Sequence, residues 1–303
     1  MSAVSADADV RVAVASAALL GESPVWHPRE QLLYYCDIPG HALNRFDPRT
    51  GSLDHWNFDT DVASLAPMLD GALLLAMRDG LWRFDARSGE LTLIAEPPYD
   101  SANERFNDGK CDPQGRFWVG TIYEPRKPPL ASLHCLVRDR LVRRCDGITV
   151  SNGLAWSPNG RTMYWSDTAA HTIYSFDFEP ASGALANRRV FASFPVKQAG
   201  QSLDSYGGRP DGAAVDVEGC YWVPMVEGLR LLRLSPEGEV VREVKLPVRC
   251  ATMPCFGGEN LKTIFITTAR ANRPAAELAD QPYAGCVLAI DVDVAGLPAN
   301  FAA

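Results

Sequence analysis

The sequence lacks blocks of basic residues and long apolar runs. Its 29 lysines and arginines are outnumbered by 37 aspartates and glutamates, which gives a formal net charge of −8. A protein that binds nucleic acid or an anionic membrane needs a local concentration of positive charge. A membrane-spanning helix needs roughly 20 consecutive apolar residues. The sequence therefore predicts neither a nucleic-acid partner nor a membrane partner.

Paired cysteines and an export signal are also missing. None of the 8 cysteines forms a C-x-x-C pair, and most lie in apolar runs such as YYCDI and GCYWV. Such runs favour buried thiols over a disulfide framework. The N-terminus has no cationic segment, and Asp7, Asp9 and Arg11 interrupt its apolar stretch, so a cleaved signal peptide is not expected. We expect a cytoplasmic protein in which residues 1–9 form a disordered tail.

A repeated pattern of short strands is what the sequence does contain. Runs rich in aromatic and β-branched residues begin at positions 32, 72, 116, 162, 220 and 263, and read LLYYCDI, ALLLAM, RFWVGTI, TMYWSD, CYWVPM and TIFITT. Most are followed by a second strand and a turn with glycine, as in LWRFDARSG. A repeat of about 40 to 60 residues with several strands in each unit is typical of the blades of a β-propeller.

The sequence therefore predicts an all-β fold, a six-bladed β-propeller with four-stranded blades, as a single domain over residues 1–303. The run VRVAV at 10–14 precedes the first unit. We expect it to pair with the C-terminal strand, which completes the last blade, closes the ring and leaves fewer exposed sheet edges.

One position in each unit is expected to face the central channel, because the first strand of every propeller blade lines that channel. We call it the axial position. A glycine follows it by eight residues in four units, which supports the alignment: Gly71, Gly115, Gly160 and Gly219. The axial positions themselves are Glu22, Ala63, Asn107, Asn152, Asp211 and Thr252. Four carboxylate or amide side chains are thus expected at one level of the channel, where the small Ala63 would leave the route for substrate.

Two carboxylates and two amides around one axis favour a cation site. An unpaired charge in a partly buried channel is costly, and a bound cation removes that cost. The donors are oxygens without histidine or cysteine, which suits Ca²⁺, Mg²⁺ or Mn²⁺ and leaves Zn²⁺ and Fe²⁺ open. Each residue alone could instead be a turn or cap residue, since Asn-Gly and Asp-Gly are common turn dipeptides. Their shared position in four of six units favours the cation.

The motifs around these positions resemble the senescence marker protein (regucalcin), gluconolactonase and luciferin-regenerating-enzyme family of six-bladed propellers. The resemblance runs from Gly21 to about Gly285 and is carried by GESPVW, RFNDGK with DPQGRFWVGT, SNGLAWS, PDGAAVDVEGCYWV and CFGGENLKTIFITTAR. It implies one divalent metal ion held by Glu22, Asn152 and Asp211.

The resemblance also implies a substrate-binding group. Arg105 and Asn107 match residues that contact substrate hydroxyls in the family, and Glu124 is retained from an acidic pair that follows the GT of RFWVGT. This chain departs from the family pattern beside Glu124, where it has Pro125. The departure leaves open whether the segment Tyr123–Pro129 forms a lid that narrows the choice of sugar.

The function we expect is divalent-metal-dependent hydrolysis of a sugar-acid lactone, an aldono- or aldaro-lactone such as gluconolactone. Asp211 would accept the proton of the attacking water. The strained serine turn of a hydrolase triad is missing, so serine catalysis is not expected. Two alternatives remain: a metal-dependent phosphotriester hydrolase of the same architecture, and a non-catalytic calcium-binding propeller. The expected partner is a small sugar lactone, and the expected state is a monomer.

Overall fold

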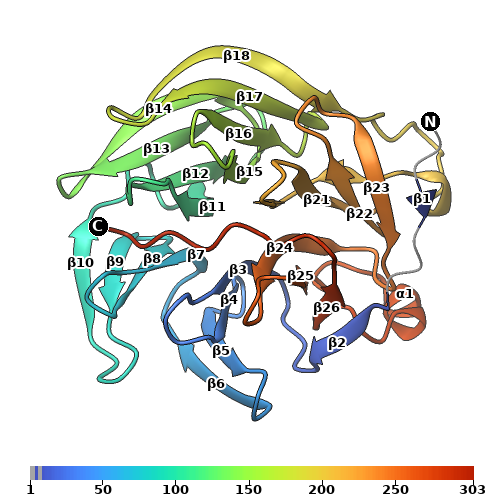
Figure 1. The fold of residues 1–303 in the computed structure, drawn as a ribbon, viewed down its shortest axis with the longest axis horizontal. Helices are drawn as coiled ribbons and strands as arrows, with labels where there is room; N and C mark the ends of the chain where they lie inside the picture. The colour runs from blue at the N-terminus through green and yellow to red at the C-terminus, as the bar shows by residue number, and fades with distance from the viewer. Residues whose placement is uncertain (1–3, 6–8) are drawn as a thin grey trace.

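Six β-sheets form a closed ring in the computed structural model, which describes residues 4–5 and 9–303 (Figure 1). Five sheets contain four antiparallel strands, and the sixth has the same four-stranded plan with its inner strand in two pieces and one extra parallel strand at its edge. In five of the blades chain order runs from the channel outward. The predicted six-bladed propeller with four-stranded blades is therefore confirmed. No helix in the described part of the chain is long and apolar enough to cross a membrane.

The strands of the first four blades follow the sequence without interruption. Blade 1 contains β3 (Gly21–Trp26), β4 (Leu33–Asp37), β5 (Ala42–Asp47) and β6 (Ser52–Asn57). Blade 2 contains β7 (Val62–Pro67), β8 (Leu73–Met77), β9 (Gly80–Phe84) and β10 (Leu91–Ala95). Blade 3 contains β11 (Glu104–Cys111), β12 (Phe117–Tyr123), β13 (Ala131–Val137) and β14 (Arg140–Ile148). Blade 4 contains β15 (Ser151–Trp156), β16 (Thr162–Asp167), β17 (Thr172–Glu179) and β18 (Ala184–Ser193).

The last two blades recruit strands from the N-terminus. Blade 5 contains an inner strand in two pieces, β19 (Arg209–Pro210) and β20 (Ala214–Val215), followed by β21 (Tyr221–Val226), β22 (Arg230–Leu234) and β23 (Val240–Lys245), with β1 (Val4–Ser5) at its edge. Blade 6 contains β24 (Ala251–Gly257), β25 (Thr263–Thr268), β26 (Val287–Asp291) and β2 (Arg11–Val14). The 3-10 helix η1 (Leu203–Ser205) and the helix α1 (Ala275–Asp280) lie in connecting segments.

The ring closes by pairing of its two ends, as predicted. Strand β2 runs antiparallel to β26, and the guanidinium of Arg11 donates to both carboxylate oxygens of Asp291 at 2.8 and 3.1 Å. The expected N-terminal tail falls largely outside the described residues, which leave out residues 1–3 and 6–8. Within that stretch, Val4 and Ser5 pair in parallel with β23.

Burial decreases from the channel outward. Every residue of the inner strands β7 and β15 is buried, whereas the outer strand β6 alternates between half-buried and exposed residues. Inner strands lie between neighbouring blades, so both of their faces are covered. The six apolar runs of the sequence form β4, β8, β12, β16, β21 and β25. These strands are also covered on both faces, so their apolar residues are nearly continuous and do not alternate with polar ones.

The turn between the first two strands of four blades requires glycine. The backbone there is left-handed, a conformation that glycine adopts without steric cost. The φ angles are 89° at Gly71, 83° at Gly115, 64° at Gly160 and 84° at Gly219. These are the glycines that support the sequence alignment.

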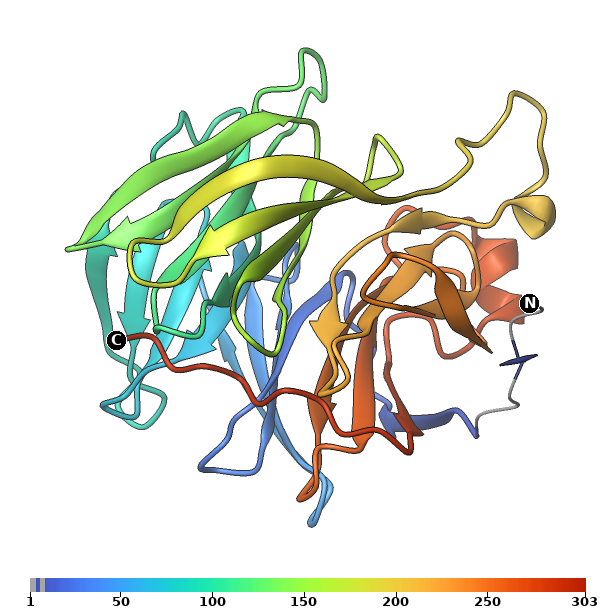
Figure 2. The same ribbon diagram turned by 45° about the horizontal axis from the view of Figure 1, so that its top comes forward.

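The C-terminal segment crosses the end of the channel at which the inner strands finish (Figure 2). We call residues 293–303 the C-terminal strap. Its backbone bonds to blade 5 through the N–H of Leu297, which donates to Val215 O at 3.1 Å, and to blade 2 through the N–H of Ala302, which donates to Pro67 O at 2.7 Å. The ring of Phe301 lies beneath Arg29, 4.4 Å from the guanidinium carbon. The strap thus joins blades on opposite sides of the ring.

Candidate active site

Each inner strand carries one extra residue at or beside its axial position. In blade 1, Glu22 pairs with Cys36 and Val25 with Tyr34, so three steps along β3 match two along β4. The same one-residue bulge occurs in blades 2, 3, 4 and 6, and in blade 5 the inner strand is interrupted at Asp211. A bulge bends the strand and redirects its side chains. The six axial positions therefore occupy equivalent places in the six blades.

A cavity of about 310 Å³ opens at the end of the channel where the inner strands begin. Five axial residues line it: Glu22, Asn107, Asn152, Asp211 and Thr252. Arg105, from the start of β11, also lines it. The cavity thus brings together all but one of the site residues that the sequence suggests, although up to 189 residues separate them along the chain.

Glu22 and Asp211 place two buried carboxyl groups in this cavity. Each side chain belongs to a residue only 7% exposed. Glu22 Oε2 accepts a hydrogen bond from the N–H of Ser23 at 3.2 Å, whereas Asp211 Oδ1 has no partner. Burial, followed by the charge of Asp211, raises the pKa of Glu22 well above its ordinary value. Burial also raises the pKa of Asp211 from 3.8 to about 7. In the absence of a positive charge, the pair therefore resists full ionisation.

A chain of hydrogen bonds connects the two axial amides. The Arg105 guanidinium donates to Asn107 Oδ1 at 2.9 Å, and Asn107 Nδ2 donates to Asn152 Oδ1 at 2.7 Å. Asn152 Nδ2 in turn donates to Thr168 Oγ1 at 2.8 Å. Because a carbonyl oxygen has two lone pairs, Asn152 Oδ1 keeps one free for another ligand. These hydrogen bonds hold both side-chain amides in a defined orientation.

Asp108 is a third buried carboxyl group that sequence reasoning missed. It is 4% exposed; its Oδ2 accepts from the N–H of Leu154 at 2.8 Å, and its Oδ1 has no partner. Its charge contributes to the raised pKa values of Glu22 and Asp211. The charge of Lys110 partly compensates it. The sequence did contain one indication of this third carboxyl group. Asp108 directly follows an axial residue, and a bulge there can direct two successive side chains inward.

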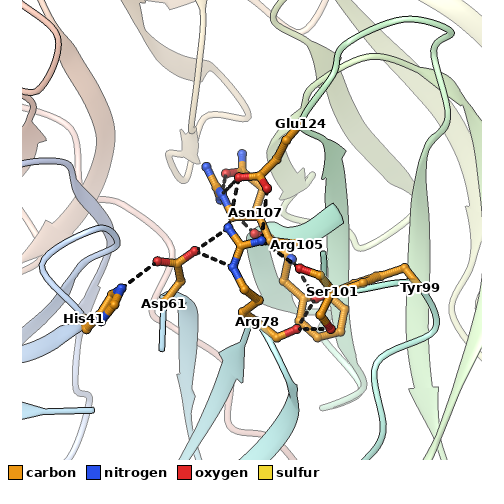
Figure 3. A network of polar contacts seen from close by, with 9 residues as sticks. His41, Asp61, Arg78, Tyr99, Ser101, Arg105, Asn107 and Glu124 are labelled. Carbon is orange, nitrogen blue, oxygen red and sulfur yellow. Dashed lines mark hydrogen bonds and ion pairs between the residues drawn. The ribbon is translucent and has the colours of Figure 1, made fainter. Parts of the chain in front are cut away.

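Glu124 and Arg105 belong to one network of polar contacts (Figure 3). Arg78 donates to both of its carboxylate oxygens at 3.0 Å, and the guanidinium of Arg105 is 3.7 Å from Oε1. Arg78 also pairs with Asp61 at 2.7 Å, and Asp61 with His41 at 3.2 Å. Glu124 is not among the residues that line the cavity. The structure thus places Glu124 outside the cavity, where it can hold Arg105 in position.

The surroundings of Ala63 differ from those that the sequence predicts. It packs in an apolar cluster with Ile38 and Phe106, and no described residue of blade 2 lines the cavity. The expectation that Ala63 leaves the route for substrate is therefore wrong. Thr252 does line the cavity, but its hydroxyl donates to Gly21 O at 2.6 Å. It therefore ties blade 6 to blade 1.

The residues of this cavity fit a divalent cation. Two buried carboxyl groups, one with an unpartnered oxygen, lie beside an amide oxygen that has a free lone pair. These are the hard oxygen donors that Ca²⁺, Mg²⁺ and Mn²⁺ prefer. A cation would also offset the cost of ionising both carboxyl groups away from water. The described residues contain no cluster of three or more His, Cys, Asp or Glu side chains suited to a metal, so the third ligand would be the amide.

Known proteins match this sequence over most of its length. A family model described as the SMP-30/Gluconolactonase/LRE-like region matches residues 20–270. The 6-deoxy-6-sulfogluconolactonase of Pseudomonas putida is 40% identical over 288 residues, which cover 95% of this chain and 96% of the relative. The putative sugar lactone lactonase YvrE of Bacillus subtilis is 33% identical over 288 residues, which cover 94% and 96%.

A solved structure has the same fold. The calcium-binding protein regucalcin from Agrobacterium tumefaciens superposes with a TM-score of 0.92 at 24% identity, and the match covers 100% of both chains. At that identity the likeness shows the fold, while the family model and the more similar relatives show descent. This chain therefore belongs to the SMP-30, gluconolactonase and LRE-like family, as its motifs predict.

Proposed function

We propose that this chain hydrolyses a sugar-acid lactone to the open-chain acid in the cavity lined by Glu22, Asn152 and Asp211. The observation that carries the proposal is the arrangement of two buried carboxyl groups, one with an unpartnered oxygen, beside hydrogen-bonding groups suited to sugar hydroxyls. Two relatives of nearly full-length coverage are named as lactonases, which supports the same reaction here.

Glu22, Asn152 and Asp211 would hold a divalent cation, which when bound would polarise the lactone carbonyl as a Lewis acid. The identity of the cation, among Ca²⁺, Mg²⁺, Mn²⁺, Zn²⁺ and Fe²⁺, is a matter for the experiment below. The anionic forms of Glu22 and Asp211 are the ones that bind a cation. Their high pKa values in the protein alone therefore predict that cation affinity rises with pH.

Arg105 and Asn107 would position the sugar. The Arg105 guanidinium is held by Glu124 and by Asn107 Oδ1, and these contacts leave N–H groups of its five-donor fork for hydroxyl oxygens. Burial lowers the pKa of Arg105, and the nearby charges of Asp61 and Glu124 oppose that effect. A positioned donor lowers the barrier by fixing the ring relative to the attacking water. Glu124 acts through Arg105 and is a positioning residue.

Asp211 would accept the proton of the attacking water at Oδ1, the oxygen that has no other partner. The water oxygen bonds to the carbonyl carbon, the bond between that carbon and the ring oxygen breaks, and the ring oxygen takes up a proton to become a hydroxyl. The proton taken up by the ring oxygen comes from Asp211, and the open-chain acid then ionises, so the products are its carboxylate and one released proton. A carboxylate within reach of the water supplies the general base that this sequence of steps requires.

Proton release during lactone hydrolysis tests the proposal. Protein stripped of metal is assayed with pentono-, hexono- and aldaro-lactones, and single divalent ions are then restored one at a time. We expect turnover to depend on the ion and to fall by at least a hundredfold in Asp211→Asn, on the scale of a lost general base. The exposed Asp139 in the β13–β14 turn serves as the matched control, and Asp139→Asn should behave as the parent.

Two results would contradict the proposal. Much higher efficiency on a phosphotriester than on every lactone would favour the phosphotriester hydrolase. Tight binding of a divalent ion by calorimetry, without turnover of any lactone in the panel, would favour a non-catalytic cation-binding propeller.

A further inference from the structure

Arg126 lies at the mouth of the cavity, where no residue of the described part of the chain forms an ion pair with it. It follows β12 in a tight turn, where its backbone N–H donates to Tyr123 O at 2.9 Å, and it lines the cavity. Its neighbour Glu124 is already bound by Arg78. Among the residues that the structure describes, no carboxylate oxygen lies within 4.0 Å of the Arg126 guanidinium. This turn belongs to the segment in which the sequence departs from the family pattern.

Arg209 supplies a second, incompletely neutralised charge to the same mouth. It lines the cavity, and its guanidinium is 3.5 Å from Glu227 Oε2. That carboxylate is shared, because Arg273 approaches Glu227 Oε1 at 3.1 Å. Burial, and then the charge of Arg209, lower the pKa of Arg126. The two guanidinium groups are therefore close enough to repel each other.

The mouth carries an excess of positive charge on a chain whose net charge is −8. Apart from the deep carboxyl groups Glu22 and Asp211, which the proposed cation would neutralise, Glu227 is the only acidic residue found in the cavity lining among the described residues. Four arginines line the cavity with it: Arg105, Arg126, Arg209 and Arg273. Arg105 approaches Glu124 and Arg273 pairs with Glu277, and neither carboxylate lines the cavity, so the excess falls on Arg126 and Arg209. Such an excess in a half-enclosed space attracts anions and raises their local concentration.

The chain places this charge close in sequence to the site of reaction. Arg209 precedes Asp211 by two residues, and the inner strand of blade 5 is interrupted between Pro210 and Ala214. Both line the cavity, with Asp211 buried and the side chain of Arg209 38% exposed. The reacting carboxyl group therefore lies deep in the cavity, and the guanidinium of Arg209 lies nearer its mouth.

We propose that Arg126 and Arg209 form a subsite for an anionic terminal group, so that the preferred substrate is a sugar lactone that carries a carboxylate, sulfonate or phosphate at the end remote from its carbonyl. This inference rests on the proposed lactone hydrolysis at Asp211. Guanidinium groups bind such oxyanions with two parallel hydrogen bonds, which gives orientation as well as affinity. The anion would also separate two like charges that otherwise face each other.

A comparison of matched lactones tests the subsite. Glucono-1,5-lactone and 6-phosphogluconolactone differ only at the terminal carbon, and glucarolactone and 6-deoxy-6-sulfogluconolactone supply the carboxylate and the sulfonate. We expect the parent to give a higher kcat/KM for at least one anionic lactone than for the neutral one. The ratio of the anionic to the neutral kcat/KM should fall by about tenfold or more in Arg126→Ala and in Arg209→Ala, on the scale of one lost charge-assisted hydrogen bond.

The control variant is Arg138→Ala, which removes the same charge from an exposed turn of blade 3 that does not line the cavity. It should leave the ratio unchanged. A parent that prefers the neutral lactone over all three anionic ones would overturn the subsite, as would equal losses on neutral and anionic substrates in Arg126→Ala.

Binding of the stable product separates this inference from the proposed function. Calorimetry measures the affinity of the metal-loaded protein for 6-phosphogluconate and for gluconate. Tighter binding of 6-phosphogluconate that Arg126→Ala abolishes would support the subsite even if no lactone is hydrolysed, in which case only the proposed reaction fails. Equal affinity for the two acids, together with lactone hydrolysis, would overturn the subsite alone.

Discussion

Replacing Asp211 by asparagine should stabilise the metal-free protein at alkaline pH. The folded protein raises the pKa of this carboxyl group from 3.8 to about 7, so folding favours its protonated form. That contribution to stability is complete below about pH 4 and is lost as the pH rises through 7. Above pH 7 the parent must hold an ionised Asp211 close to Glu22, whereas the variant holds a neutral amide of the same shape.

The pKa values of Asp211 in the unfolded and the folded protein set an upper limit for the gain in stability. A difference of about three between them corresponds to about 4 kcal/mol, because one pKa unit is about 1.4 kcal/mol. An unfolding entropy of about 2.1 cal/mol/K per residue gives about 0.6 kcal/mol/K for a chain of this length, so 4 kcal/mol shifts the Tm by about 6 °C. The raised pKa of Glu22 acts in the same direction, because Asp211→Asn removes the charge that opposes its ionisation.

The assay is thermal unfolding in a chelator at pH 5 and pH 8, with the exposed variant Asp139→Asn as control. We expect Asp211→Asn to gain about 6 °C over the parent at pH 8 and less than half of that gain at pH 5, because the contribution is lost progressively between the two pKa values. Adding the divalent ion should reverse the order at pH 8, since a ligand that binds only the folded state stabilises the parent by mass action. A chelated variant that melts at or below the parent at pH 8 would refute the assignment of an unneutralised buried charge to Asp211.

Four further changes separate the roles described above. Glu22→Gln should keep the fold but weaken binding of the divalent ion, and equal affinity by calorimetry would remove Glu22 from the ligand set. Arg105→Ala should lower kcat/KM for lactones by about tenfold with near-normal ion binding; unchanged kinetics would place its charge outside catalysis. Ala63→Phe should lower the free energy of unfolding by about 1–3 kcal/mol through overpacking, and an unchanged Tm would contradict the packing around it. Phe301→Ala should lower stability by roughly 1–2 kcal/mol through lost burial and the cation–π contact, while an accompanying loss of ion affinity would show that the strap acts on the cavity.

The repetition of strands and turns made the fold predictable. Six apolar runs with glycine turns specify six equivalent sheets, and the apolar run at 10–14 finds the partner that the last blade lacks. The axial alignment could be drawn from spacing alone because every blade places its inner strand in the same way. Four polar side chains in that alignment were therefore enough to indicate the level of the channel at which Glu22, Asn152 and Asp211 meet.

The remainder of the site depends on contacts between blades, which spacing does not encode. Glu124 meets Arg78 because blades 2 and 3 are neighbours, and its nearest cation in sequence is not its partner. Asp108 faces inward because a bulge interrupts the alternation of β11, which a simple period of two does not anticipate. Ala63 is covered by apolar residues from its own and neighbouring blades. In each case the sequence gives the position of the residue along the chain but not the direction of its side chain.

The pairing of β2 with β26 imposes an order on how the protein is made. Residues 11–14 leave the ribosome early, yet their partner strand lies at residues 287–291. At a synthesis rate of about 5–20 residues per second, β2 waits for roughly 14–55 s before it can pair. During that interval the nascent chain exposes an unpaired strand, and blades 1 to 5 lack a closed ring to hold them together. We therefore expect that chains truncated or stalled before residue 287 will be recognised by chaperones, and that the emergence of β26 converts an open arc into a closed ring.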